Sequence, residues 1–117
     1  MKSVTNEKAR VFAKDVADYC KYLKKEYHDY NLADQLYRSA TSIYANLGEM
    51  AHSESISDFS HKLGIALKEA NESLRWLKHS QDIGHMPDTY RFLFKDCSMI
   101  IKLLYKALET NKQKGNK

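Results

Sequence analysis

Residues 34–49 read DQLYRSATSIYANLGE, and apolar side chains recur in this stretch every three or four positions. That spacing places them along one side of an α-helix. With the residue that follows the stretch, the apolar stripe consists of Leu36, Ala40, Ile43, Leu47 and Met50. The stretch therefore predicts an amphipathic helix that buries one face.

A second, polar stripe runs beside the apolar one and is named the polar column. Its members are Gln35, Arg38, Ser42, Asn46 and Glu49. Short amides and hydroxyls between one arginine and one glutamate suit a tight polar contact. In one interpretation Arg38 pairs with Glu49 across a subunit boundary. In the other the column forms a network inside one subunit, since buried polar groups need partners in either case.

Apolar residues recur with helical spacing in three further segments. The sequence predicts helices over residues 5–27, 31–52, 56–83 and 87–111. One proline and four glycines leave little material for the turns of a many-stranded sheet. Because the connections are short, consecutive helices should be antiparallel. We expect one all-α domain over residues 1–117, an up-down-up-down four-helix bundle with a frayed tail at 112–117.

Local signals predict where these helices begin and end. Asn31 is expected to cap the second helix through its amide oxygen. Ser55 and Asp58 resemble a capping box at the start of the third helix. Gly84 suits a left-handed residue at the end of the third helix, and Pro87 suits the first turn of the fourth.

Cysteine content and hydropathy bear on the compartment. Cys20 and Cys97 both lie on apolar stripes, which predicts two reduced thiols in the core. No basic-then-apolar leader opens the sequence, and uninterrupted apolar runs such as 99–101 are far too short to span a bilayer. We expect a cytoplasmic protein without a membrane partner.

Several large apolar residues lie off the core stripes. Phe92, Met99 and Leu103 form one line on the fourth helix, and Ile65 and Trp76 share an angle on the third. A fully exposed large apolar side chain forgoes roughly 1.5–3 kcal/mol of burial free energy. This surplus predicts a homo-oligomer whose interface contains these residues.

Basic residues line the first helix on the side opposite its apolar stripe. This basic stripe consists of Arg10, Lys14, Lys21 and Lys25. Repeated around a ring of subunits it would form a belt that neutralises phosphates. A solvated helix face is the alternative, because Asp15, Asp18 and Glu26 are interleaved nearby. The formal charge of +4 permits nucleic-acid contact without requiring it, and no base-stacking platform is evident.

Catalytic and metal-binding patterns are weak. Glu49-x-x-His52 matches the ligand spacing of di-iron bundles, and Asp58-x-x-His61 nearly does. Both flank the turn between the second and third helices, away from the middle of the bundle. No strained Gly-x-Ser-x-Gly turn and no glycine-rich phosphate loop are present. We predict that the protein binds no metal, cofactor or small-molecule substrate and that it is not an enzyme.

A longer pattern extends across the second and third helices. It reads Gln35-x-x-Arg38-Ser39-Ala40-x-Ser42-Ile43-x-x-Asn46-Leu47-x-Glu49, then Asp58-Phe59-x-x-x-Leu63-x-Ile65-Ala66-x-x-x-x-Asn71-Glu72 and Trp76-Leu77. The pattern resembles the bacterial four-helix bundle proteins encoded in intervening sequences of large-subunit ribosomal RNA genes. Accessory variability proteins of diversity-generating retroelements are relatives. The resemblance covers nearly the whole chain, although Met50 stands where the family usually has glycine.

This resemblance implies an antiparallel bundle that assembles into a barrel-like homopentamer. It also implies structured RNA or a nucleoprotein as the suspected ligand. Two functions stay open at this point. The first is an oligomeric module that binds RNA through the basic stripe. The second is a protein adapter that docks a nucleic-acid enzyme such as a reverse transcriptase.

Overall fold

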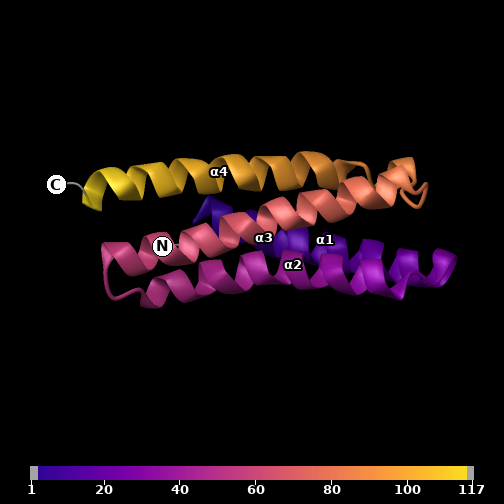
Figure 1. Cartoon of the computed structure of the whole chain (residues 1–117), viewed down its shortest axis with the longest axis horizontal. Coiled ribbons are helices and arrows are strands. Elements are labelled where there is room, and N and C mark those ends of the chain that lie inside the picture. Colours follow the sequence, from indigo (N-terminus) through magenta and orange to yellow (C-terminus); the bar gives the residue numbers. More distant parts are fainter. Residues whose placement is uncertain (1–2, 116–117) are drawn as a thin grey trace.

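Four long helices run up and down along a common axis in the computed structural model, which describes residues 3–115 (Figure 1). They are α1 (Val4–Tyr27), α2 (Tyr30–Glu49), α3 (Ile56–Asp82) and α4 (Phe92–Gly115). Two short 3₁₀ turns lie in the connections, η1 (Met50–His52) and η2 (Asp88–Tyr90). The all-α, antiparallel four-helix bundle expected from the periodicity is thereby confirmed.

The core follows the apolar stripes. Leu36, Ala40 and Ile43 on α2 are completely buried, and Leu47 is nearly so. Met50 was expected to continue this stripe, but it lies in η1 and is only partly buried against the core. On α4, Ile100 is almost completely buried, whereas its neighbour Ile101 is only half-buried against the core. Within the described residues, no helix is long and apolar enough to cross a lipid bilayer.

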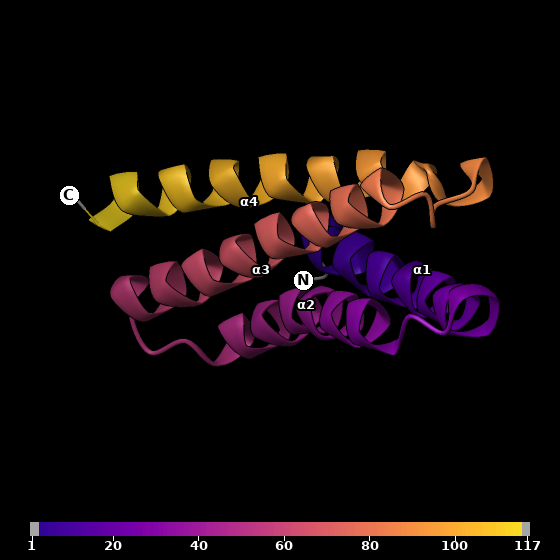
Figure 2. The ribbon, with the colours of Figure 1, turned by 45° about the vertical axis from the view of Figure 1, so that its right-hand side comes forward.

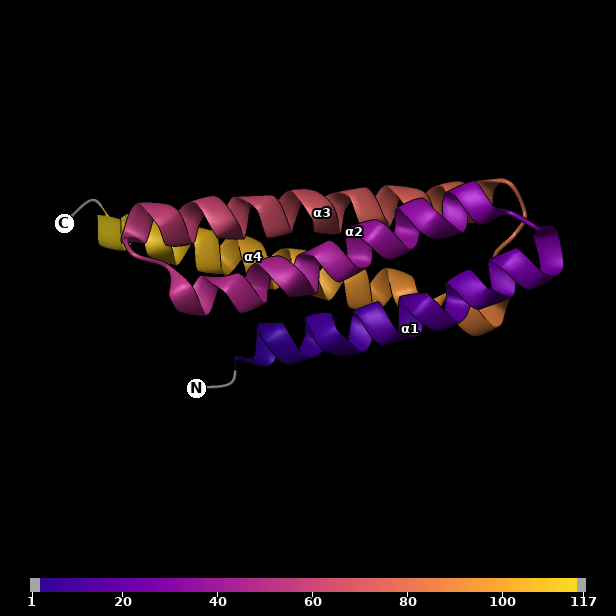
Figure 3. The same ribbon diagram turned by 90° about the horizontal axis from the view of Figure 1, so that it is seen from below.

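The four helices do not pack equally closely. Each consecutive pair of helices packs closely, whereas α1 and α4 make far fewer contacts with each other. In Figure 2, α3 lies between α2 and α4. Seen from below in Figure 3, the N-terminal part of α1 diverges from α4. The bundle is therefore more open between α1 and α4 than at its other three sides.

The start of α2 differs from the prediction. Helical residues begin at Tyr30, and Asp29 is the N-cap: its Oδ1 accepts a hydrogen bond from the backbone N–H of Leu32 at 3.3 Å. Asn31, the predicted cap, therefore lies inside the first turn. The Asp29 carboxylate and the Asn31 amide oxygen are both suitable N-cap acceptors. The conformation of the α1–α2 turn therefore determines which of the two residues caps the helix.

The predicted signals at α3 are confirmed. Ser55 Oγ accepts the backbone N–H of Asp58 at 3.0 Å, and Asp58 Oδ2 accepts the backbone N–H of Glu54 at 3.2 Å. The second bond reaches one residue further back than in the usual capping box. Gly84 follows the end of α3 with φ = 77°, a left-handed conformation that favours glycine.

Two other predicted boundaries are wrong by a few residues. The α-helical part of α2 ends at Glu49, and η1 covers the rest of the predicted segment. Pro87 precedes η2 and not the α-helix, which begins only at Phe92. In both places the chain tightens into a 3₁₀ turn, a frequent arrangement at helix ends.

The frayed tail predicted for 112–117 is also wrong for its described part, because α4 continues to Gly115. Asn111 is nearly buried, and its side-chain amide donates to the backbone oxygen of Ile56 at 2.9 Å and to Ser60 Oγ. These bonds join α4 to the start of α3 and support the last turns. Residues 116–117 lie outside the described part of the chain.

Both cysteines are free and buried, as predicted. Cys20 Sγ donates to the Ala33 carbonyl at 3.1 Å, and Cys97 Sγ donates to the Ala70 carbonyl at 3.3 Å. Burial raises the pKa of each thiol to about 12. The two residues thus act as small core side chains and not as reactive thiolates at neutral pH.

Candidate nucleic-acid interface

The basic stripe lies on the solvent-facing side of α1. All four members are exposed, while Phe12, Val16 and Leu23 on the opposite side are buried. The charge of Arg10 is balanced by Glu7, because the Arg10 Nε donates a hydrogen bond to Glu7 Oε2 at 3.1 Å. Lys14, Lys21 and Lys25 have no ion-pair partner among residues 3–115. Their charges are therefore available to an external anion.

Two of the three acidic residues that interleave with this stripe in the sequence, Asp15 and Asp18, lie toward α4, whereas Glu26 is exposed. Asp18 Oδ2 accepts a hydrogen bond from the Tyr90 hydroxyl at 3.0 Å, which draws Asp18 toward α4. Asp15 is half-buried, and burial, followed by the charge of Asp96 on α4, raises its pKa. Both carboxylates thus face α4, and the cations face outward.

Three exposed tyrosines on α2 lie beside the basic stripe, and we name them the tyrosine line. They are Tyr30, Tyr37 and Tyr44, which are 55%, 48% and 40% exposed. Because they are seven residues apart, they fall almost on one line along the helix. The sequence shows the heptad spacing of these tyrosines, but it does not show which helix they lie beside.

One ion pair and two weaker electrostatic interactions place the tyrosine line next to α1. Lys24 Nζ lies 3.0 Å from Asp34 Oδ1. The pKa of Lys24 is raised first by Asp34 and more weakly by the nearby Tyr30. At the other end of α2, the pKa of Arg10 is raised first by Glu7 and more weakly by Tyr44. The two helices run side by side in opposite directions (Figure 3). The basic stripe and the tyrosine line therefore flank one seam.

The polar column faces α3 within the subunit. The Arg38 guanidinium contacts Glu69 Oε2 at 3.5 Å and also pairs with Glu72 Oε1. Asn46 Nδ2 donates to the Ser42 carbonyl at 2.8 Å. Of the two interpretations left open by the sequence, contacts inside one subunit are present for the side chains of Arg38 and Asn46. For the half-buried Gln35 and Ser42 and the exposed Glu49, a place in an oligomer interface stays a prediction.

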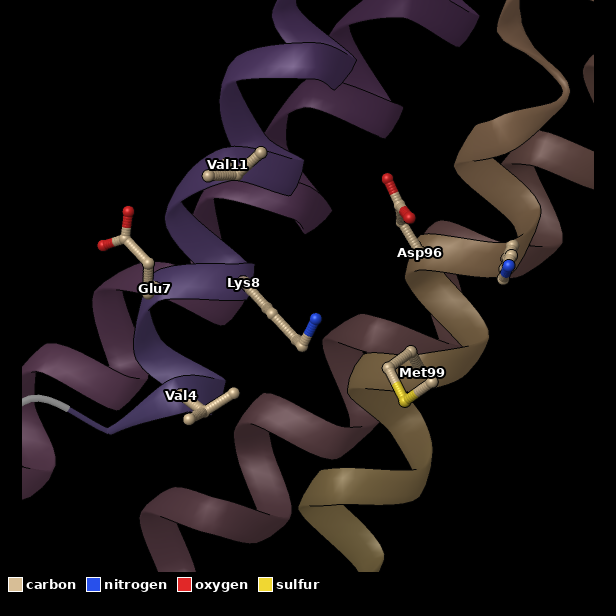
Figure 4. A pocket seen from close by; sticks show the side chains of 7 residues that line it. Val4, Glu7, Lys8, Val11, Asp96 and Met99 are labelled. Carbon is tan, nitrogen blue, oxygen red and sulfur yellow. The ribbon is translucent and has the colours of Figure 1, made fainter.

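The surplus apolar line on α4 borders a pocket between α4 and the first half of α1. Phe92 and Met99 are 45% and 40% exposed, and Leu103 is half-buried. The pocket has a volume of about 490 Å³ and is lined by Val4, Glu7, Lys8, Val11, Lys95, Asp96 and Met99. Figure 4 shows Lys8 and Asp96 reaching into the space between the two helices.

The α1–α4 divergence thereby leaves apolar residues exposed on both helices. Val4 and Val11, which the sequence did not mark, are 66% and 39% exposed. Together with Phe92 and Met99 they form what we name the apolar face. Its existence depends on the spacing of two helices that are distant in sequence.

The two surplus residues on α3 lie elsewhere. Trp76 packs partly against the core, with its ring centroid 6.2 Å from that of His79. Ile65 is half-buried and lines a groove between α3 and α4. Neither belongs to the apolar face. Their assignment to an oligomer interface stays a prediction, and both are already partly covered within the subunit.

The histidines and carboxylates that were considered as metal ligands are dispersed or engaged. Asp58 caps α3 and pairs with Lys62 Nζ at 3.3 Å. At the opposite end, His85 Nδ1 lies 3.3 Å from Asp29 Oδ2, and its ring stacks on Tyr27 at 3.8 Å. Among residues 3–115, no three His, Cys, Asp or Glu side chains gather as potential metal ligands.

Similarities to known proteins agree with this architecture. The chain is similar to the crystal structure of a protein of unknown function from the S23 ribosomal protein family of Bacteroides thetaiotaomicron, with a TM-score of 0.86 and 35% sequence identity. The match covers 90% of this chain and 98% of that chain. No curated protein matches the chain. Residues 2–106 match the 23S rRNA-intervening sequence proteins, and the chain belongs to that family.

Proposed function

We propose that this protein is a non-enzymatic, oligomeric binding module that holds structured RNA through the basic stripe of α1. The observation that carries the proposal is the segregation of charge on α1. Lys14, Lys21 and Lys25 are exposed and unpaired within the described chain, while Asp15 and Asp18 turn toward α4. Membership in a family named for ribosomal RNA intervening sequences is consistent with an RNA ligand.

The physical basis of binding is phosphate neutralisation. Each lysine that contacts a phosphate releases condensed counterions, so the logarithm of the binding constant falls with the logarithm of salt concentration. The slope is about −0.9 for each phosphate contacted on a B-form duplex. Such binding has little sequence preference, which fits a stripe without base-reading side chains.

Charge reversal tests this proposal. We expect Lys14→Glu with Lys21→Glu to lower the affinity for an RNA hairpin at least about tenfold and to reduce the salt slope by about two. The matched control is Lys102→Glu with Lys106→Glu, two exposed lysines on α4. Fluorescence anisotropy between 50 and 200 mM salt measures both quantities. Equal losses in the two double variants, or no binding by the unaltered protein, would reject the proposal.

We propose that the apolar face mediates contact between copies. Phe92→Lys places a charge on this face, and we expect it to lower the native mass while leaving the helix content unchanged, because a buried unpaired charge opposes association. Tyr105→Lys is the control, since Tyr105 is 56% exposed on α4 but lies outside the line of Phe92, Met99 and Leu103. Sedimentation at micromolar concentration is the measurement.

The family resemblance suggests five subunits, and an unaltered protein that sediments as a monomer would exclude any such assembly. If the Phe92→Lys variant has an unchanged native mass, the contact between copies must instead lie on another face, such as that of Gln35 and Glu49.

The adapter function is supported by the same apolar face. A pocket of about 490 Å³ lined by both apolar and charged side chains can also receive a side chain from a different protein. Co-purification with a nucleic-acid enzyme that survives nuclease treatment and the Lys14→Glu, Lys21→Glu changes would favour this function over RNA binding.

A further inference from the structure

We propose that the seam between α1 and α2 binds unpaired RNA nucleotides, whose bases stack on the tyrosine line while the basic stripe holds their phosphates. This inference rests on the proposed function and narrows its ligand. In this proposal, the single-stranded segments of a structured RNA, such as loops and ends, bind to the face formed by α1 and α2.

The two lines of side chains match in length and direction. Arg10 and Lys25 are fifteen residues apart, which is about 22 Å along a helix. Tyr30 and Tyr44 are fourteen residues apart, or about 21 Å. Because α1 and α2 are antiparallel, Arg10 lies near Tyr44, and Lys24 lies near Tyr30. Cations and rings therefore lie close together at both ends of the seam.

The tyrosine line differs from four of the other five tyrosines, all except the exposed Tyr105, in lacking close internal partners. Tyr19, Tyr22, Tyr27 and Tyr90 pack against one another in a ring cluster at the end of the bundle. Tyr37 and Tyr44 have neither a ring partner nor a side-chain hydrogen bond among residues 3–115, and Tyr30 has only the His28 ring at 6.3 Å. Their faces are open to a ligand.

Charge favours a polyanion as that ligand. The two carboxylates on the seam, Glu7 and Asp34, are each paired with a cation, Arg10 and Lys24 respectively. Lys14, Lys21 and Lys25 remain in excess. An apolar protein partner would not need these lysines, whereas a polynucleotide uses both them and the rings. A positive track with aromatic side chains is the arrangement by which proteins bind single strands.

The tyrosine rings would give the site a preference for single-stranded RNA over duplex RNA. Bases in a duplex are stacked on their neighbours and cannot reach a side-chain ring, but unpaired bases can be splayed onto one. Stacking on an aromatic ring strengthens binding by roughly tenfold per base and tolerates any base. The lysines alone give no such preference, because they contact phosphates in both forms.

The experiment compares two RNAs with the same number of phosphates, an unstructured strand of uridines and a blunt-ended duplex, using the full-length protein. We expect Tyr37→Leu with Tyr44→Leu to weaken binding of the unstructured strand about tenfold or more and to leave duplex binding within about twofold. Tyr105→Leu, a change of the same kind on α4, should alter neither. Tyr37→Phe with Tyr44→Phe keeps the rings and should retain binding.

The outcomes separate this inference from the proposed function. Equal losses for both RNAs, or no loss for either, would overturn the stacking role, whereas hairpin binding that depends on Lys14 and Lys21 would still support the RNA-binding module. If the unaltered protein binds neither RNA, both proposals fail.

A second measurement does not depend on the stability of any variant. A strand containing 4-thiouridine, bound to the unaltered protein and irradiated, should form adducts on α2 at one or more of the three tyrosines. Adducts confined to other helices would contradict the assignment.

Discussion

Replacing Phe12 with alanine lowers the free energy of unfolding by about 3–5 kcal/mol, the range observed when a buried phenylalanine is truncated. Phe12 is only 1% exposed and belongs to the core that α1 shares with the other helices. Truncation removes its burial and leaves a cavity that helices joined by short connections cannot close completely. Urea denaturation followed by circular dichroism, at one fixed protein concentration, measures the change.

An exposed residue on the same helix provides the control for this prediction. Lys14 is exposed and lies outside the apolar face, so Lys14→Ala should change the free energy of unfolding by only about 0.5 kcal/mol. If the two substitutions have similar effects, the orientation of α1 is incorrect.

Raising the pH from 8 to 10 lowers the free energy of unfolding by about 3 kcal/mol through the two buried thiols alone. Burial raises the pKa of Cys20 and of Cys97 from the ordinary 9.0 to about 12. Above pH 9 the thiols ionise in the unfolded chain but stay neutral in the fold. The stability is therefore fully present below pH 9 and is lost progressively as the pH rises toward 12.

Urea midpoints at pH 8, 9 and 10 test this prediction. The matched variant is Cys20→Ala with Cys97→Ala, which is less stable at pH 8 but should show a flatter pH dependence. Between pH 9 and 10, the loss of unfolding free energy in the unaltered protein should exceed that in the double variant by at most about 1.4 kcal/mol for each thiol. Parallel pH profiles for the two proteins would show that the thiols ionise as readily in the fold as in the unfolded chain.

The helical periodicity predicted most of the core, because apolar residues on the inner stripe have no other low-energy position. It did not reveal which polar residues join that core. Ser39 and Ser73 are completely buried, and their hydroxyls lie 2.8 Å apart between α2 and α3. Tyr19 donates to Ser80 at 2.9 Å in the same way. Serine is compatible with either face of a helix, so only the presence of a partner on the facing helix determines its burial.

The candidate site was predictable only in part, for a related reason. The basic stripe follows from spacing within α1, and its exposure is confirmed. Asp18 turns toward α4 because it accepts a hydrogen bond from Tyr90, and Asp15 is half-buried near Asp96 because α4 packs beside α1; both partners lie more than seventy residues further along the chain. The position of the tyrosine line beside the basic stripe depends likewise on how α2 packs against α1.

By itself, the sequence determined the number of helices, their approximate bounds, the buried stripes and the cationic side of the first helix. Each of these properties depends on residues within a few turns of one another. The tertiary structure alone decided that α1 diverges from α4, that Arg38 pairs with Glu69 and Glu72 on α3, and that three tyrosines border the lysines. These features depend on the rotation and separation of whole helices, which are set by packing across the core and not by any local pattern.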